Sequence, residues 1–297
     1  MAVVDSDLSR AQAVAAQFGA QAFDSVAPLA GLKVKAASVA VPTVHHLPVA
    51  RSLMKAGIDV LVEKPLAPSL TEADELIALA KQLQRVGQVG HLERFNPAVR
   101  ATVPLITQPM FFEIHRLSVF TPRSLDVDVV LDLMIHDIDV VLSFVNSPIK
   151  EIRAVGLPIL SGRVDIANVR MEFESGCVAN FTASRVSTER VRKVRFFQPR
   201  QYISVDYGRQ DVMVFTVGAE SGGAPSVNPQ IKMAKPELTA EEPLHAEIRS
   251  FLHCVRQRST PVVSLDDGRR ALAVALDIVA AIEEHGRRVR LDKLSQG

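Results

Sequence analysis

Three polar side chains stand at helical spacing inside an apolar segment, and one of them can exchange a proton near neutral pH. Residues 131–140 read LDLMIHDIDV, with Asp132, His136 and Asp139 at positions i, i+4 and i+7. On a helix these positions lie on one face, about a turn apart. A carboxylate one turn from an imidazole holds its tautomer and favours its charged form, so His136 is a candidate acid/base. The alternative is a helix with one wet edge, where Asp132, Asp137 and Asp139 are merely solvated.

A lysine follows a second apolar segment, one that is typical of a buried strand. Residues 59–63 read DVLVE, and the chain continues with Lys64 and Pro65. Ligands of open α/β sheets bind at the carboxyl ends of the strands. A lysine there can donate to a substrate hydroxyl and favour loss of its proton, although a salt bridge at the strand end explains the same residues. We expect a cis Lys64–Pro65 bond, since X-Pro bonds have only about 0.5–1 kcal/mol of trans preference.

The elements that must position these residues differ between the two parts of the chain. Up to about residue 99, apolar strand-like runs alternate with helical segments, which predicts a parallel, doubly wound sheet. We expect the first helix to be capped by Ser6 and closed by Gly19. The predicted strands are residues 2–4, 37–42, 59–63 and 86–91, and the predicted helices are residues 7–18, 45–56 and 69–84.

From about residue 100 the sequence alternates apolar and polar residues in long runs, which predicts an antiparallel sheet with one covered face. Hairpin turns are expected at residues 174–176 and 207–209, and a surface loop at residues 218–229. Helices are expected at about residues 243–256 and 264–285. The predicted fold is therefore α/β plus α+β. Its domains are a truncated dinucleotide-binding (Rossmann) domain, residues 1–99, and a substrate-binding and oligomerisation domain with a large, mostly antiparallel open sheet, residues 100–297.

The composition is that of an ordinary globular protein in a reducing compartment. The 297 residues are 47% hydrophobic and 23% charged, with a net charge of +1. This balance gives no electrostatic reason to expect nucleic acid or an anionic membrane. The N-terminus lacks a signal-peptide pattern, no segment is long and apolar enough to span a bilayer, and Cys177 and Cys254 have no metal-ligand spacing. We therefore expect a cytoplasmic protein without a bound metal.

The cofactor evidence is divided. Sheets of this kind often bind a dinucleotide through G-x-G-x-x-G after the first strand, and no two glycines of this chain have G-x-G spacing. The first strand-like run, however, ends on Asp5. This run looks like the second strand of such a fold. An acid at the end of the second strand bonds the adenosine ribose 2′-OH and favours NAD over NADP. A helix cap or a solvated turn residue explains Asp5 as well.

Four motifs follow one another along the chain: Pro42-Thr43 with His46, VLVEKP over residues 60–65, GHLERFNP over residues 90–97 and DLMIH over residues 132–136. Their order resembles that of the glucose–fructose oxidoreductase/inositol dehydrogenase/rhizopine-catabolism (Gfo/Idh/MocA) family of sugar oxidoreductases. The resemblance covers nearly the whole chain, and the segments GHLERFNP and MIHDIDV (residues 134–140) look most like the branch that oxidises the 3-hydroxyl of UDP-N-acetylglucosamine or related nucleotide sugars.

The resemblance implies hydride transfer between a sugar or nucleotide-sugar carbon and NAD, with NADP the less favoured cofactor. His136 falls on the family's acid/base position, Lys64 on the position that polarises the hydroxyl, and Asp132 on the acid that binds substrate and supports His136. The remaining implied contacts are Asp5, Pro42, Thr43, His46, Glu63 and Lys64 for the cofactor, and Arg94 and Asn96 for the substrate. A homodimer or homotetramer is also expected.

The sequence departs from the family at its beginning, where the first strand, the glycine loop and the first helix have no counterpart. We expect a gap or a non-native pairing between the strands at residues 2–4 and 37–41, and weak binding of NAD by these 297 residues, because the pyrophosphate site is missing. We expect that the start codon has been placed too late; a clipped form of the protein is the alternative. The alternative function is a catalytically inactive, truncated homologue that serves as a sugar-binding or structural subunit.

Overall fold

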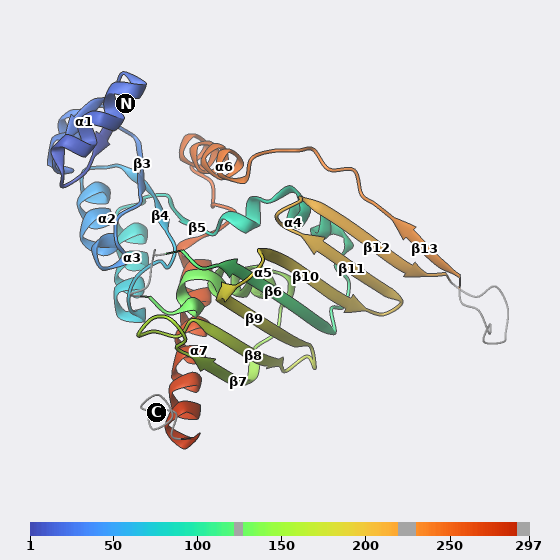
Figure 1. Ribbon diagram of the computed structural model, residues 1–297. Coiled ribbons are helices and arrows are strands. Elements are labelled where there is room, and N and C mark those ends of the chain that lie inside the picture. The colour runs from blue at the N-terminus through green and yellow to red at the C-terminus, as the bar shows by residue number, and fades with distance from the viewer. Residues whose placement is uncertain (122–126, 219–229, 290–297) are drawn as a thin grey trace. The chain divides into compact units, whose positions relative to one another are not determined.

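The computed structural model describes residues 1–121, 127–218 and 230–289, and these divide into two compact units (Figure 1). Unit 1 comprises Met1–His91 and Glu247–Leu272, and unit 2 comprises Leu92–Ala246 and Ala273–Gly297. The expected boundary after residue 99 is therefore wrong in two respects: unit 1 ends earlier, and a late segment returns to it. The return is held by the backbone, since Val89 N–H donates to Val263 O and Gln88 forms an antiparallel bridge with Ser264.

Unit 1 contains two separate parallel sheets. Strands β3 (Ala36–Val39), β4 (Asp59–Glu63) and β5 (Gly87–Gly90) form one sheet in that order. Strands β1 (Ala2–Val4) and β2 (Gln21–Phe23) form the other. Because β1 and β3 belong to different sheets, the expected gap between them is confirmed.

The helices of unit 1 begin and end close to the predicted residues, with one wrong cap. Helix α1 (Leu8–Phe18) is capped by Asp7 rather than Ser6, because the Asp7 carboxylate accepts from the N–H groups of Ser9 and Arg10. Gly19 closes α1 with φ 59°, a left-handed conformation that glycine adopts at little cost. The other helices are η1 (Ala27–Gly31), η2 (Thr43–His45), α2 (His46–Lys55), α3 (Leu70–Gln82), most of α6 (Pro243–Gln257) and the first part of α7 (Leu265–Val289).

Unit 2 is built on an eight-stranded sheet, and its strand order is β13-β12-β11-β10-β6-β9-β8-β7. All neighbours pair antiparallel except β6 and β9, which are parallel. The hairpins expected at residues 174–176 and 207–209 are confirmed, whereas residues 219–229 of the expected loop lie outside the described residues. The strands are β6 (Phe111–Val119), β7 (Ile149–Leu157), β8 (Ile166–Phe173), β9 (Val178–Ser187), β10 (Val191–Gln198), β11 (Gln201–Asp206), β12 (Asp211–Val217) and β13 (Ile231–Ala234).

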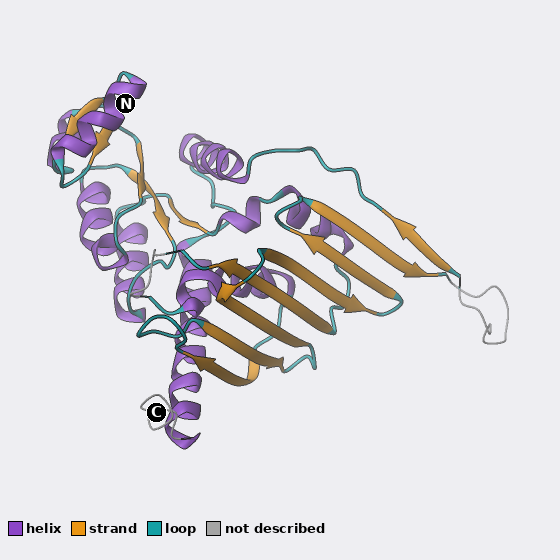
Figure 2. Cartoon of the chain, in the orientation of Figure 1, coloured by secondary structure: helices purple, strands orange, loops and turns teal. Residues whose placement is uncertain are grey.

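One face of this sheet is covered by helices, as predicted. Phe144 of α5 (Ile135–Phe144) packs against Phe112 and Phe196, with ring centroids 6.4 and 6.0 Å apart. Figure 2 shows α5 behind the strands, and no described helix of unit 2 crosses the opposite face. The other helices of unit 2 are η3 (Leu92–Phe95), α4 (Pro97–Thr102), η4 (Val103–Leu105), η5 (Val130–Met134) and the last part of α7.

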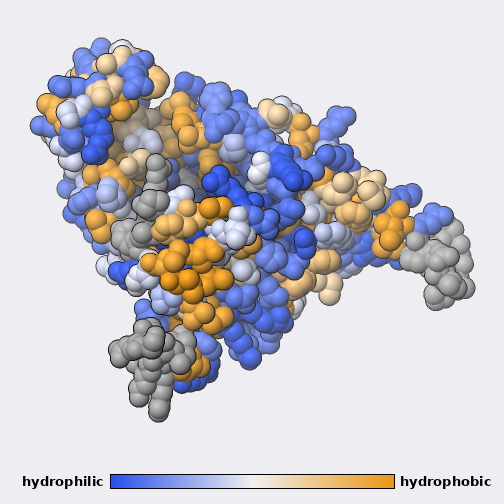
Figure 3. Space-filling model, in the orientation of Figure 1, coloured by the Kyte–Doolittle hydropathy of each residue, from blue (hydrophilic) through white to orange (hydrophobic). Residues whose placement is uncertain are grey.

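The open face carries a row of aromatic rings. Phe111, Phe197, Tyr202 and Phe215 follow one another across four strands, with centroids 5.7, 4.9 and 5.1 Å apart. Figure 3 shows a small group of hydrophobic atoms at the β13 end of the sheet, where Ile231 and Met233 are 63% and 65% exposed. Across the described residues, we find no helix that combines the length and the apolar character needed to cross a membrane.

Candidate active site

The helix predicted over residues 131–140 begins with a π-helical turn. Asp132 lies in η5, and His136 lies in the first turn of α5, which continues η5 directly. Both side chains are half-buried. Single π turns inside helices are frequent at functional sites. The segment therefore presents a carboxylate and an imidazole one turn apart, as the spacing predicts.

The other two acidic residues of this helix are not solvated, so the wet-edge alternative is wrong for them. Asp137 is 1% exposed and Asp139 is 2% exposed. Burying a carboxylate is costly unless it is paired and hydrogen-bonded. Each has an arginine beside it: Arg116 for Asp137, and Arg94 for Asp139, at an N–O distance of 3.5 Å.

Arg116 of β6 joins α5 to η3. Its Nε and Nη2 donate to the two carboxylate oxygens of Asp137 at 2.6 and 2.9 Å, in the bidentate geometry of a strong pair. Its Nη1 and Nη2 donate to Glu93 Oε1, both at 3.1 Å. The guanidinium carbon also lies 5.4 Å from the centroid of the Tyr207 ring. We call Glu93, Arg116 and Asp137 the buried charge cluster.

The arginine of this cluster remains charged. Burial alone would lower the pKa of Arg116, but the carboxylates of Asp137 and Glu93 raise it well above its ordinary value. Burial, followed by the charges of Asp137 and Glu93, raises the pKa of Tyr207, so its phenol stays neutral. The cluster therefore holds α5 against the sheet through Asp137, the residue that directly follows His136.

Asn96, an expected substrate contact, has an internal role. Its Oδ1 accepts from Ala98 N–H and caps α4, and its Nδ2 donates to Glu93 Oε2 and Tyr207 O, each at 3.1 Å. With 2% of its surface exposed, Asn96 holds η3 and the buried charge cluster in place. Asn96 therefore has the ordinary structural role of a helix cap.

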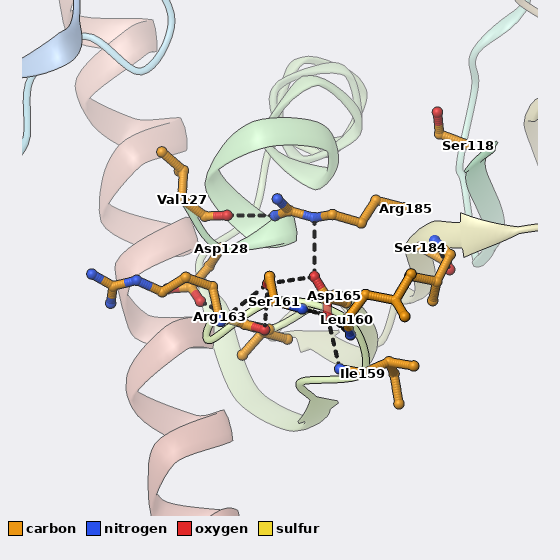
Figure 4. A network of polar contacts seen from close by, with 12 residues as sticks. Ser118, Val127, Asp128, Ile159, Leu160, Ser161, Arg163, Asp165, Ser184 and Arg185 are labelled. Atoms are coloured by element: carbon orange, nitrogen blue, oxygen red, sulfur yellow. Dashed lines mark hydrogen bonds and ion pairs between the residues drawn. The ribbon is translucent and has the colours of Figure 1, made fainter. Parts of the chain in front are cut away.

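A second polar network fixes the chain immediately before η5 (Figure 4). Buried Asp165 accepts from the N–H groups of residues 159, 160 and 161 and from Ser161 Oγ, at 2.6–2.8 Å. It also pairs with Arg185, whose Nη2 donates to Val127 O. Asp128 Oδ1 accepts from Val164 N–H at 2.9 Å. Residues 127 and 128 are thus tied to the loop that follows β7, which sets where the helix with Asp132 and His136 begins.

Unit 1 places Lys64 directly after β4. The Lys64–Pro65 bond is cis, as predicted. His46 lies beneath this segment, 1% exposed: its Nδ1 is 3.0 Å from Pro65 O and its Nε2 is 2.9 Å from Val41 O. Since both ring nitrogens contact backbone carbonyls, His46 ties the segment after β3 to the segment that carries Lys64. His46 therefore positions the loops that follow β3 and β4.

Glu63 lies against the end of the neighbouring strand. A Cβ built at Gly90 of β5 would be 3.0 Å from Glu63 Oε2, so glycine leaves the room that this carboxylate occupies. The sequence places Glu63 among the cofactor contacts only through the family resemblance. Its contact with Gly90 links the two motifs, EKP and GHLERFNP, at the carboxyl ends of β4 and β5.

A cavity of about 1430 Å³ lies between β1 and β3, and the residues expected at a dinucleotide fit it only in part. Asp5 and Pro42 are on its wall, and Thr43 follows Pro42 in η2. The Asp5 carboxylate accepts from Asp7 N–H and pairs with Arg10 at 3.2 Å, so it is available to a ribose only in competition with these groups. The sequence holds no glycine-rich turn to receive the pyrophosphate. The adenosine end fits, whereas the pyrophosphate end does not.

Sequence reasoning missed the buried charge cluster. Glu93 lies inside GHLERFNP, next to Arg94 and close to Asn96, and attention to that motif could have found it. Asp137 was identified only as a solvated residue, because helical periodicity alone cannot distinguish a paired buried carboxylate from an exposed one. No local signal marks Arg116, which comes from a β-strand 21 residues before its partner.

Comparisons with known proteins place both parts of the chain in one family. Residues 1–91 match a family model described as an oxidoreductase family with an NAD-binding Rossmann fold, and residues 77–204 match the GFO/IDH/MocA C-terminal domain. UDP-N-acetylglucosamine 3-dehydrogenase of Acidithiobacillus ferrooxidans is 36% identical over 282 residues, which are 95% of this chain and 89% of the relative. The scyllo-inositol 2-dehydrogenase (NAD(+)) of Bacillus subtilis is 25% identical over 300 residues, which cover 95% of this chain and 86% of that relative.

Solved structures agree with this placement. A structure of the A. ferrooxidans enzyme superposes with a TM-score of 0.88 at 35% identity, covering 95% of this chain and 89% of that one. The structure of levoglucosan dehydrogenase with NADH and levoglucosan superposes with a TM-score of 0.81 at 16% identity. The match covers 95% of this chain and 87% of that one, and it shows a similarity of fold. Both comparisons extend through the two units described above.

Proposed function

Since this chain belongs to the Gfo/Idh/MocA family of NAD-binding oxidoreductases, we propose that it oxidises a hydroxyl of a nucleotide sugar, with the 3-hydroxyl of UDP-N-acetylglucosamine as the first candidate. One observation carries the proposal: a dehydrogenase of that substrate is 36% identical over 95% of the chain. Half-buried Asp132 and His136 on one helix, and Lys64 at the end of β4, are consistent with it.

The proposed roles follow from the chemistry of each side chain. Lys64 Nζ donates to the hydroxyl oxygen of the sugar and stabilises the charge that develops as its proton leaves. His136 accepts that proton, and Asp132 orients the imidazole and bonds the sugar. The chemistry that NAD supplies when bound is acceptance of the hydride. On the cofactor side we propose Asp5 and Pro42 as contacts, with Thr43, Glu63 and His46 shaping the adjoining loops.

The oligomeric state is part of the proposal. We infer that two copies of the chain associate through the open face of the eight-stranded sheet. The row of Phe111, Phe197, Tyr202 and Phe215 offers contiguous aromatic surface, and the flanking Arg195–Glu113 ion pair supplies charges of both signs to a second copy. Free, buried Cys177 and Cys254 fit a reducing compartment, and we propose the cytoplasm.

The test is to measure NADH formation by the chain with UDP-N-acetylglucosamine at saturating NAD. Oxidation of the nucleotide sugar, with little turnover of free N-acetylglucosamine, is the expected result. A second candidate is a polyol dehydrogenase, which the match to scyllo-inositol 2-dehydrogenase favours. Turnover of scyllo-inositol in preference to the nucleotide sugar would establish that candidate. Sugar binding without any NADH formation by a correctly folded protein would establish the inactive alternative.

A further inference from the structure

Two arginines, Arg190 and Arg192, lie at the start of β10, near the buried charge cluster. Arg192 of β10 pairs directly with Arg116 of β6, so both side chains project from the same face. Arg190 directly precedes β10, and its charge acts on Arg192. Both residues are exposed, and within the described residues neither takes part in an ion pair.

This position borders the helix of the proposed acid/base. Arg116, the cross-strand neighbour of Arg192, contacts Asp137, which follows His136 directly. Figure 1 shows β10 beside β6, with α5 behind them. The third arginine of this region, Arg185, is already committed to Asp165 and Val127 O (Figure 4). Arg190 and Arg192 are therefore the cations of this edge that remain available to a ligand.

Arg192 is near charges of both signs, those of Arg116 and Arg190 and those of Glu93 and Asp137. A purely structural explanation is that Arg192 neutralises Glu93 and Asp137, which outnumber Arg116 in the buried charge cluster. In that case the pKa of Arg192 would be raised. Instead, burial first and then the charges of Arg116 and Arg190 lower its pKa, and the two carboxylates offset this only in part. An anion bound at this place would relieve the repulsion among the guanidinium groups.

We propose that Arg190 and Arg192 bind the diphosphate of the nucleotide-sugar substrate. Guanidinium groups donate two parallel hydrogen bonds to a phosphate, and two arginines suit a ligand with two linked phosphoryl groups. Glu189, which directly precedes Arg190, is exposed. Its negative charge weakens the attraction of the two arginines for other anions. The inference rests on the proposed function and identifies what in unit 2 recognises the nucleotide part of the substrate.

Titration calorimetry with UDP tests the inference without requiring turnover. Arg190→Gln and Arg192→Gln should each weaken UDP binding roughly 10- to 100-fold, the loss expected for a charge-assisted hydrogen bond. Added salt should lower the affinity of the wild type for UDP more than it lowers the affinity of either variant. Arg256→Gln of α6 is the matched control, because it removes the same charge from an exposed arginine of another element. It should bind UDP like the wild type.

Further outcomes separate this inference from the proposed function. Thermal unfolding and circular dichroism establish that each variant is folded, and Arg192→Lys should recover part of the affinity. Equal UDP affinity in the wild type and both glutamine variants, or an equal loss in Arg256→Gln, would overturn the inference even if the wild type oxidises UDP-N-acetylglucosamine. No UDP binding by a wild type that turns over scyllo-inositol would also overturn it. In turnover assays the two substitutions should raise KM for the nucleotide sugar and leave kcat within about threefold.

Discussion

His136 and Lys64 are the residues on which the proposed chemistry depends. His136→Asn should keep the helix and lower kcat by about 10²–10⁴-fold, the usual effect of losing a general acid/base. Lys64→Met should be at least as damaging, because it also removes a charge-assisted bond to the substrate. The measurement is NADH formation at saturating substrates, with exposed His253→Asn of α6 as the control. Turnover at the wild-type rate in both variants would refute the assigned roles.

Arg116 is the residue whose removal should cost most stability. Arg116→Met leaves Glu93 and Asp137 buried without their shared partner, and breaking a buried pair typically costs about 3–5 kcal/mol. We expect a loss of this size in the free energy of unfolding measured with urea. Arg10→Met, which breaks exposed ion pairs to Asp5 and Asp7, is the control and should cost at most about 1 kcal/mol. Similar losses in the two variants would mean that the cluster adds nothing beyond a surface pair.

At the scale of elements, the loop after β7 makes stability depend on acid pH. Burial by itself would raise the pKa of Asp165, but the hydrogen bonds from Ser161 Oγ and from three backbone N–H groups lower it to about 2. A depressed pKa stabilises the fold above the unfolded-state value of about 3.9. This contribution, about 2.6 kcal/mol at 1.36 kcal/mol per unit, should disappear as pH falls from about 4 to about 2.

Asp165→Asn is the matched variant for this pH dependence, since it keeps the shape of the side chain and cannot titrate. We expect it to be less stable than the wild type at neutral pH, and we expect the difference to shrink below pH 4. Urea unfolding at a series of pH values measures it. A stability difference that stays constant between about pH 4 and about pH 2 would show that the Asp165 carboxylate does not have this role.

The separation of β1 from β3 should affect the affinity of the chain for NAD. The chain provides Asp5 and Pro42 on the wall of the cavity between these strands and no glycine-rich turn, so NAD should bind weakly to residues 1–297. Fluorescence titration with NADH measures the affinity. A Kd in the low micromolar range or below would show that the pyrophosphate is received by groups other than a glycine-rich turn.

At the scale of the whole molecule, the aromatic row on the open sheet face predicts self-association. Tyr202→Glu places a charge between Phe197 and Phe215 and should convert dimers to monomers in sedimentation or light scattering. Tyr202→Phe keeps the stacking surface and is the control. An unchanged mass for the glutamate variant, or a wild type that is monomeric at micromolar concentration, would rule out this face as the interface.

The sequence by itself determined the alternation of strands and helices, the antiparallel sheet, the family, and the motifs with Lys64, Asp132 and His136. These features are local, because a period of 2 or 3.6 residues and a short motif can be recognised within a few turns of chain. The cap of α1 was missed by one residue, since Ser6 and Asp7 are both good caps and only the backbone conformation chooses between them.

Only the tertiary structure decided which polar residues are buried and with what partners. Asp137 has the same type and spacing as an exposed acid, and it became a buried ion only because β6 brings Arg116 beneath α5. The return of Glu247–Leu272 to unit 1 was likewise set by long-range pairing. Such pairings join residues far apart in the chain, and no local periodicity records them, because their energy comes from desolvation and contact in the folded state.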